Sequence, residues 1–257
     1  MTPTFKTERG RVVSAVTADQ MREVDRVAVD TVSLGLLQMM EHAGRNLAEV
    51  ARETVESTEG TETAENGRIV VLAGNGGNGG GGICAARHLA NGGIDVTVVL
   101  DRADNELTGA AARQRRILAA TDAAVVSGGH REIAHHLENT EVVVDAVVGY
   151  GLTGPLRGTA ATLVESIPED SRVVSLDVPS GIDATTGDSP GMVVAPDTIL
   201  TLALPKTGLV GTEATAGDLL LADIGIPRGV YDRLDIDYTD PLDGARRVRL
   251  QPVDKPD

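Results

Sequence analysis

Residues 69–91 read Ile-Val-Val-Leu-Ala-Gly-Asn-Gly-Gly-Asn-Gly-Gly-Gly-Gly-Ile-Cys-Ala-Ala-Arg-His-Leu-Ala-Asn, and this stretch decides the fold. The apolar run Ile69–Ala73 predicts a strand that is buried on both faces. A segment of glycine and asparagine follows at 74–82, and residues 83–91 have the composition of a helix. A strand, a glycine-rich turn and a helix in this order favour an α/β fold with a parallel sheet.

The same alternation continues on both sides of this stretch. Apolar residues recur at helical spacing in 17–28 and 36–50. Further strands are predicted at 96–100, 142–148, 173–176, 199–204 and 219–224. Helical stretches lie between them at 108–120, 130–138 and 160–167. We therefore expect a three-layer α/β/α Rossmann-like sandwich with a mainly parallel central sheet, which binds ligands at the carboxyl ends of its strands.

Length and composition fit one domain in a reducing compartment. The chain has 257 residues, and we expect a single α/β domain at 1–235 followed by a charged C-terminal tail at 236–257. No apolar run approaches the length of a membrane span, and the first ten residues lack the apolar core of a signal peptide. The only cysteine, Cys84, excludes an internal disulfide. These features predict a cytoplasmic protein.

The charge of the chain is strongly negative. Its formal net charge is -15 and its pI is about 4.7, which disfavours binding to nucleic acid or to anionic membranes. Of its 23 basic residues, only Lys6, Lys206 and Lys255 are lysines. An acidic, lysine-poor surface predicts a halophilic protein that stays soluble in high salt. The alternative is an ordinary acidic protein from a low-salt cytoplasm.

The glycine-rich segment at 74–82 is the strongest local signal for a ligand. Glycine lets a ligand approach the main chain closely, and free N–H groups at the start of the next helix favour an anion such as phosphate. No Gly-Lys-Ser/Thr follows the segment, so it is not a P-loop. The alternative is a flexible turn without a ligand.

Two carboxylates and one lysine follow later strands. Asp145 lies inside an apolar run, where a carboxylate is costly to bury unless it is paired or binds a cation. Asp177 ends another strand and is followed by Val-Pro-Ser-Gly, which exposes Ser180 on a turn. Lys206 follows a third strand. Each carboxylate alone could cap a turn, but together these residues place polar groups along one edge of the sheet.

In order, these segments resemble the motifs of the NAD(P)H-hydrate epimerase family, also called the YjeF N-terminal domain or apolipoprotein A-I-binding protein family. The resemblance covers roughly residues 16–230. It rests on the following segments: Met-Glu-His-Ala-Gly at 40–44, the glycine-rich segment at 74–82, Ala-Ala-Arg-His-Leu at 85–89, and the segments at 145–158, 177–181, 204–209 and 222–227.

The resemblance implies an isomerase that interconverts the R and S forms of hydrated NADH or NADPH in nicotinamide nucleotide repair. It implies Asp177 as the catalytic carboxyl and a potassium ion held by Asn78, Asp145 and Ser180. The substrate-binding residues that it implies are Gly77, Asn78, Gly79, Gly80, Gly81, Gly149, Tyr150, Gly151, Leu152, Thr153, Gly154, Pro155, Asp177 and Lys206. It further implies a homodimer, and a separate dehydratase that acts on the product.

The chain departs from the family pattern at two positions. Gly77 stands where the family has the first asparagine of its loop, and Gly81 stands where it has an aspartate. The three potassium ligands that the resemblance implies are kept, whereas the missing carboxylate calls the implied substrate contacts and the catalytic rate into question. The alternative function is therefore a catalytically degenerate relative that binds the nucleotide without converting it. The sequence leaves the choice between NADH and NADPH open.

Overall fold

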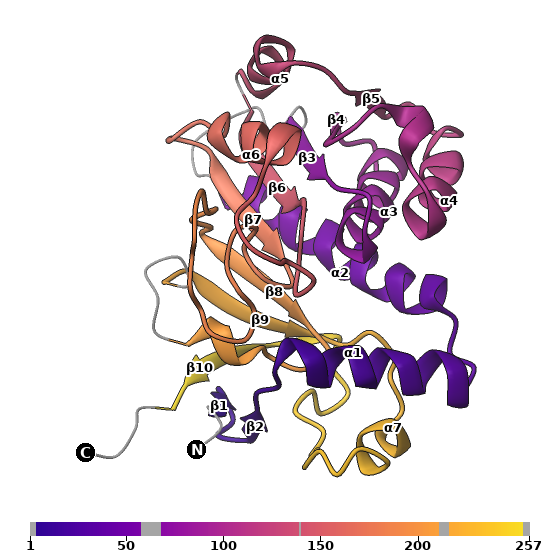
Figure 1. Ribbon diagram of the computed structural model, residues 1–257, viewed down its shortest axis with the longest axis vertical. Coiled ribbons are helices and arrows are strands. Elements are labelled where there is room, and N and C mark those ends of the chain that lie inside the picture. Colours follow the sequence, from indigo (N-terminus) through magenta and orange to yellow (C-terminus); the bar gives the residue numbers. More distant parts are fainter. Residues whose placement is uncertain (1–3, 58–67, 139, 211–215, 254–257) are drawn as a thin grey trace.

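The computed structural model describes residues 4–57, 68–138, 140–210 and 216–253. Within these ranges, ten strands form one sheet in the order β2-β1-β10-β9-β8-β7-β6-β3-β4-β5 (Figure 1). The strands are β1 Thr4–Thr7, β2 Val12–Ser14, β3 Ile69–Ala73, β4 Val96–Leu100, β5 Ala124–Val126, β6 Val142–Ala146, β7 Arg172–Leu176, β8 Thr198–Leu202, β9 Asp218–Ala222 and β10 Arg247–Pro252. Neighbours from β9 to β5 are parallel, and β10, β1 and β2 extend the sheet antiparallel. The predicted mainly parallel α/β sheet is confirmed.

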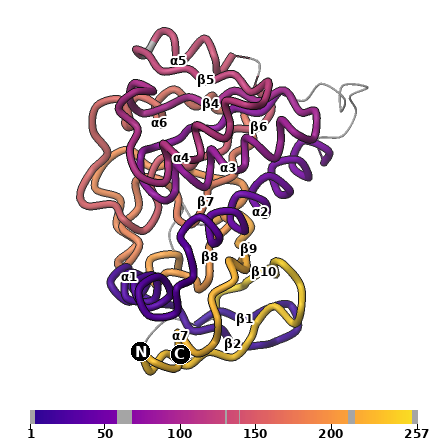
Figure 2. Tube along the Cα trace, turned by 90° about the vertical axis from the view of Figure 1, so that its right-hand side faces the viewer, coloured from indigo at the N-terminus to yellow at the C-terminus, as the bar shows by residue number. Residues whose placement is uncertain are grey.

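Helices cover both faces of the parallel part. The α-helices are α1 Ala18–Arg26, α2 Leu36–Glu56, α3 Gly77–Asn91, α4 Gly109–Leu118, α5 His130–Leu137, α6 Gly158–Glu165 and α7 Arg228–Asp232. In β3, Ile69 and Val71 pack in a core with α2, α3 and α4, whereas Val70 and Leu72 pack in a core with α5 and α6. Figures 1 and 2 show how these helices are arranged around the sheet. Burial on both faces explains why β3 is apolar at every position. No helix in the described ranges is both long and apolar enough to cross a bilayer.

The sequence predicted a charged C-terminal tail at 236–257, and this prediction is wrong for strand β10, Arg247–Pro252. Strand β10 pairs antiparallel with β9 on one side and with β1 on the other, so it is an integral part of the sheet (Figure 1). Leu250 is buried, while Arg247 pairs with Glu49 and Glu53 of α2. The arginines of β10 form ion pairs with acidic side chains, and this pairing allows a charged segment to be a strand of the sheet. Residues 254–257 lie outside the described residues.

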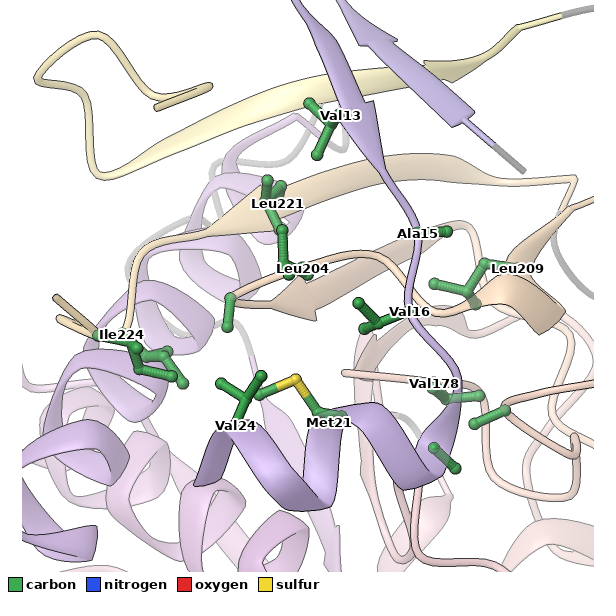
Figure 3. Close-up of a cluster of buried hydrophobic side chains, with 14 of the residues drawn as sticks. Val13, Ala15, Val16, Met21, Val24, Val178, Leu204, Leu209, Leu221 and Ile224 are labelled. Carbon is green, nitrogen blue, oxygen red and sulfur yellow. The ribbon is translucent and has the colours of Figure 1, made fainter. Parts of the chain in front are cut away.

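Helix α1 lies across the end of the sheet where the parallel strands finish. Thr17 caps it, because the Thr17 hydroxyl accepts a bond from the Gln20 N–H and the Gln20 side chain accepts one from the Thr17 N–H. Met21 and Val24 are buried and point toward the side chains of the sheet (Figure 3). Just before the helix, Val16 forms an isolated parallel bridge with Lys206. The bridge fixes α1 beside the segment that follows β8.

Helices α2 and α3 are held together by close packing and by the contacts of Glu41 with Arg87 and His88, which we call the Glu41 clamp. A β-carbon on Gly44 would lie 2.6 Å from Cys84 Cβ, so the two helices touch backbone to side chain at this point. Glu41 Oε2 accepts a bond from Arg87 at 2.5 Å, and Glu41 Oε1 lies 2.8 Å from His88 Nε2. Arg87 holds the pKa of Glu41 down, at about 2. Burial raises the pKa of the Cys84 thiol to about 12, so this thiol is a packing group.

Replacement of Glu41 by glutamine is expected to reduce stability at neutral pH, by an amount that shrinks in acid. The pKa of Glu41 is depressed in the folded chain, so its contribution is present above the unfolded value of about 4.3 and is lost as pH falls toward about 2. Denaturant unfolding of both proteins between pH 7 and pH 3 measures this difference. Glu56→Gln, at the exposed pair with Arg52, serves as the control. A difference independent of pH would contradict the clamp.

Candidate active site

A cavity of about 530 Å³ opens where β3, β6, β7 and β8 end. Glycines and apolar side chains form most of its wall, with α1 and α2 contributing one side. The predicted substrate residues that line it are Gly77, Asn78, Gly81, Gly149, Tyr150, Gly151, Asp177 and Lys206. Residues from separate parts of the sequence therefore meet at the edge where doubly wound sheets bind ligands.

Asp177 and Lys206 form a buried ion pair in the cavity wall. Asp177 directly follows β7, and its φ of +68° lies in the left-handed region, which aspartate tolerates better than most residues. Its carboxylate accepts backbone N–H bonds from Tyr150 and Leu202, each at 3.3 Å, and contacts the Lys206 ammonium. Only 1% of the Lys206 side chain and 5% of the Asp177 side chain are exposed. These donors suit an ionised carboxylate, which can stabilise positive charge on a ligand.

Asp25 is a second carboxyl in the cavity wall, and the sequence analysis did not identify it. It is half-buried on α1, and its carboxyl accepts the Tyr150 hydroxyl. Burial raises the pKa of Asp25, although the bond from Tyr150 opposes the rise. Arg22, one helical turn earlier, also lines the cavity, with its guanidinium 5.9 Å from the centre of the Tyr150 ring. The charged residues Arg22 and Asp25 beside the buried stripe of α1 are the sequence signal. The burial of Met21 and Val24 and the bridge of Val16 to Lys206 bring this helix to the site.

Asp145 is fully buried in β6 beneath the cavity floor. Its carboxylate accepts bonds from Ser180 N at 2.8 Å, Ser180 Oγ at 2.5 Å and Ser175 Oγ at 2.8 Å. Burial raises the pKa of Asp145, and these hydrogen bonds oppose the rise. Among the described residues, no Lys, Arg or His pairs with it. The structure thus brings together two of the predicted potassium ligands, Asp145 and Ser180, as a buried acid without a protein counter-charge.

Asn78, the third predicted potassium ligand, lies at the start of α3. Its buried Nδ2 has no hydrogen-bond partner within the described ranges. A β-carbon on Gly149 would lie 3.0 Å from Asn78 Oδ1 and 3.1 Å from Asp177 Oδ2. Gly149 therefore lets three strand ends converge, and one end of the Asn78 amide is available to a ligand.

Comparison with known proteins identifies the family. The sequence profile of the YjeF-related protein N-terminus matches residues 36–208. The chain belongs to this family. The crystal structure of yeast ynu0 (YNL200c) has the same fold, with a TM-score of 0.80 at 24% identity over 92% of this chain and all of that one.

Two relatives named NAD(P)H-hydrate epimerase match most of the chain. The protein from Dehalogenimonas lykanthroporepellens is 41% identical over 96% of this chain and 96% of its own length. The protein from Rhodopirellula baltica is 34% identical over 82% of this chain and 84% of its own length. A bifunctional NAD(P)H-hydrate repair enzyme from Hyperthermus butylicus is 35% identical, but the chain spans only 41% of that protein.

The glycine-rich segment of this family member differs from the predicted loop. Helix α3 begins at Gly77, whereas the sequence predicted a helix from residue 83, so most of the segment is helical. A β-carbon on Gly79 would lie 1.7 Å from the Gly74 carbonyl oxygen, and one on Gly80 would lie 2.7 Å from Met40 Cε. Gly79 and Gly80 thus pack against protein instead of lining the cavity. The free N–H groups at the helix start lie at Gly76 and Gly77, beside the cavity.

Gly81 lies within α3 and lines the cavity. A β-carbon there would lie 2.8 Å from Leu176 Cδ2, so the Leu176 side chain occupies the space beside this glycine. Its φ is not in the left-handed region, and backbone strain does not require glycine. The departure at Gly81 is therefore accommodated by packing.

The end of the predicted 149–155 segment leaves the main cavity. Leu152 and Gly154 line a neighbouring hollow of about 240 Å³, together with Asp183 and Asp188. Thr153 and Pro155 line neither the cavity nor the hollow. Pro155 packs against Gly191, because a β-carbon on Gly191 would lie 3.0 Å from Pro155 Cβ. The segment 149–155 therefore begins at the main cavity beside Asp177 and continues into the neighbouring hollow.

Proposed function

We propose that this chain is an NAD(P)H-hydrate epimerase, which interconverts the R and S forms of hydrated NADH or NADPH. The observation that carries the proposal is the buried Asp177–Lys206 pair in a cavity lined by glycines at the strand ends. The names of the relatives support the same activity. A buried charged pair that faces a cavity is typical of a site that handles protons or developing charge.

In this proposal, the hydrated nicotinamide ring lies beside Asp177. Loss of the ring hydroxyl as water makes the ring a cation, in which the ring nitrogen supplies the electrons. The carboxylate of Asp177 stabilises that cation and takes the proton of the water that adds to the ring. In the reverse direction the same proton returns to the leaving hydroxyl. The apolar wall of Met39 and Met40 limits the water that reaches the ring. The main chain from Gly149 outward binds the ribose and pyrophosphate.

We also propose that a potassium ion is held by Asn78, Asp145 and Ser180. Their donors are carboxylate, hydroxyl and amide oxygens, which hard cations prefer. The buried Asp145 carboxyl, which has no cationic partner among the described residues, fits such an ion. Asn78 would face the ion with its Oδ1 oxygen, because its unpartnered Nδ2 is a hydrogen-bond donor. Asn78, Asp145 and Ser180 would hold the ion, which would supply positive charge near the ligand.

Direct conversion tests the function. Purified protein in potassium chloride is mixed with the R-hydrate of NADH, and the S-hydrate is followed by chromatography against a blank without protein. The proposal requires approach to the equilibrium mixture from either epimer at a rate proportional to protein concentration. A rate equal to that of the blank, with nucleotide still bound, would favour the catalytically degenerate relative.

Gly81→Asp is expected to speed turnover about tenfold relative to Gly81→Ala. Both variants displace Leu176, so their comparison isolates the carboxylate. A charged hydrogen-bond partner contributes about 1.5–3 kcal/mol, equivalent to about ten- to a hundredfold in rate. The initial rates of epimerisation in both directions measure the effect. Equal rates in the two variants would show that the ligand does not use this position.

We further propose that a separate dehydratase consumes the product of this chain.

We also propose that the chain works in a cytoplasm of high salt concentration. The stability of its fold is expected to rise between 0.1 M and 1 M tetramethylammonium chloride. The net charge of -15 is screened over about 10 Å at the lower salt concentration and over about 3 Å at the higher one. The melting temperature measures this change in stability, and full stability in dilute buffer would contradict a halophilic protein.

Sedimentation would test the homodimer that the resemblance implies.

A further inference from the structure

Asp25 and Asp177 lie at the two ends of one residue. The Tyr150 backbone N–H donates to Asp177 at 3.3 Å, and the Tyr150 hydroxyl donates to Asp25. All three residues line the same cavity. The Lys206 ammonium contacts Asp177 and lies 5.8 Å from the centre of the Tyr150 ring. A ligand ring beside Tyr150 therefore has a carboxyl near each end of that side chain.

The two carboxyls differ in their surroundings. Asp177 is paired with Lys206 and accepts two backbone bonds, an arrangement that suits a carboxylate. Asp25 has no ion pair within the described ranges, and burial raises its pKa, although the bond from Tyr150 and the charge of Lys206 oppose the rise. Two such groups in one cavity provide one proton donor and one proton acceptor.

We propose that Asp25 is a second catalytic carboxyl, which serves one face of the hydrated nicotinamide ring while Asp177 serves the other. The inference rests on the proposed epimerase function and deepens it. An epimerase must release water from one face of carbon six and add water to the opposite face. A single carboxyl on one side reaches only one of these positions, so a group on each side supplies what the reaction needs.

The protonated carboxyl on one face gives its proton to the ring hydroxyl, the C6–O bond breaks, and the lone pair of the ring nitrogen forms a C=N bond. Water then adds to carbon six from the other face, the C=N electrons return to nitrogen, and the proton of that water passes to the second carboxylate. One water leaves, one enters, and nothing is oxidised. The proton returns from the second carboxyl to the first through solvent between turnovers.

Oxygen exchange distinguishes this role from a structural one. In water labelled with ¹⁸O, the wild type incorporates label at the ring hydroxyl of both epimers. Asp25→Asn keeps an acceptor for the Tyr150 hydroxyl. We expect this variant to lose about 10²- to 10⁴-fold in epimerisation. It should still label one epimer within a few-fold of the wild-type rate, because the Asp177 face remains active. Asp177→Asn should show the reverse selectivity and label only the other epimer.

The controls make each outcome decisive. Glu23→Gln changes an exposed acid on the same helix and should behave as the wild type. Wild-type epimerisation by Asp25→Asn, or equal loss of labelling in both epimers, would overturn the role of Asp25. If Asp25→Asn does not fold, Asp177→Asn decides alone, because labelling of neither epimer excludes a second acid. A wild type that neither epimerises nor exchanges would refute the proposed function itself.

Discussion

Replacement of Asp177 by asparagine is expected to lower the rate of epimerisation by about 10²- to 10⁴-fold, the usual contribution of a positioned general acid or base. Asparagine keeps the size and the acceptor oxygen of aspartate, so bonds from Tyr150 and Leu202 can persist. What is lost is the charge beside the ring and the proton that the carboxyl transfers. Initial rates with each epimer measure the effect, and kcat should fall more than KM rises.

The same substitution leaves Lys206 buried without its partner. Removal of one member of a buried pair costs about 3–5 kcal/mol, so instability could be mistaken for a catalytic effect. The double variant Asp177→Asn with Lys206→Met removes the stranded charge and should recover much of the stability while staying inactive. Asp170→Asn, an exposed acid outside the cavity, is the matched control. Wild-type turnover by the Asp177 variant would refute the mechanism.

The parallel part of the sheet could be predicted from the sequence because burial on both faces leaves apolar runs. β3 and β4 begin and end where the sequence predicted, and the strands predicted at 142–148, 199–204 and 219–224 end two residues earlier in the structure. At the first two of these ends the chain stays apolar after it has left the sheet, whereas Asp223 follows the third. The antiparallel strands β1, β2 and β10 were missed because they are short or rich in charge, and arginine side chains in ion pairs do not show an apolar pattern.

The glycine-rich segment shows a different limit. Intrinsic propensity argues against a helix through six residues that include five glycines, yet α3 begins at Gly77. Close packing explains this, because Gly79 and Gly80 touch Gly74 and Met40 where larger side chains would not fit. Such contacts depend on long-range structure, so local sequence does not reveal them.

The residues of the candidate site also differ in whether the sequence could locate them. Asp177 and Lys206 could be located because they follow recognisable strands and because lysine is rare in this chain. Asp25 could not, since it lies on a helix far away in sequence, which tertiary packing of Met21 and Val24 and the bridge between Val16 and Lys206 bring to the cavity. The sequence locates groups at strand ends, whereas it takes the tertiary structure to show which helix completes the wall.

Replacement of potassium chloride by tetramethylammonium chloride at equal ionic strength is expected to lower the melting temperature by about 5–10 °C. The physical reason is Asp145, which is fully buried without a cationic partner in the described residues. A ligand that binds only the folded state, at a hundred times its dissociation constant, adds about 2.7 kcal/mol of stability. In a chain of this size, each kcal/mol corresponds to roughly 2–4 °C.

Equal ionic strength separates this effect from screening, because both salts shield the net charge of -15 alike. Asp145→Asn should melt at the same temperature in the two salts, since an amide does not supply the charge that holds the ion. The variant also loses acceptor capacity toward Ser180 and Ser175, so its melting temperature should lie below that of the wild type in potassium. The difference between salts, not the absolute value, therefore reports the ion. A wild-type protein that melts at one temperature in both salts would show that Asp145 is stabilised by hydrogen bonds alone.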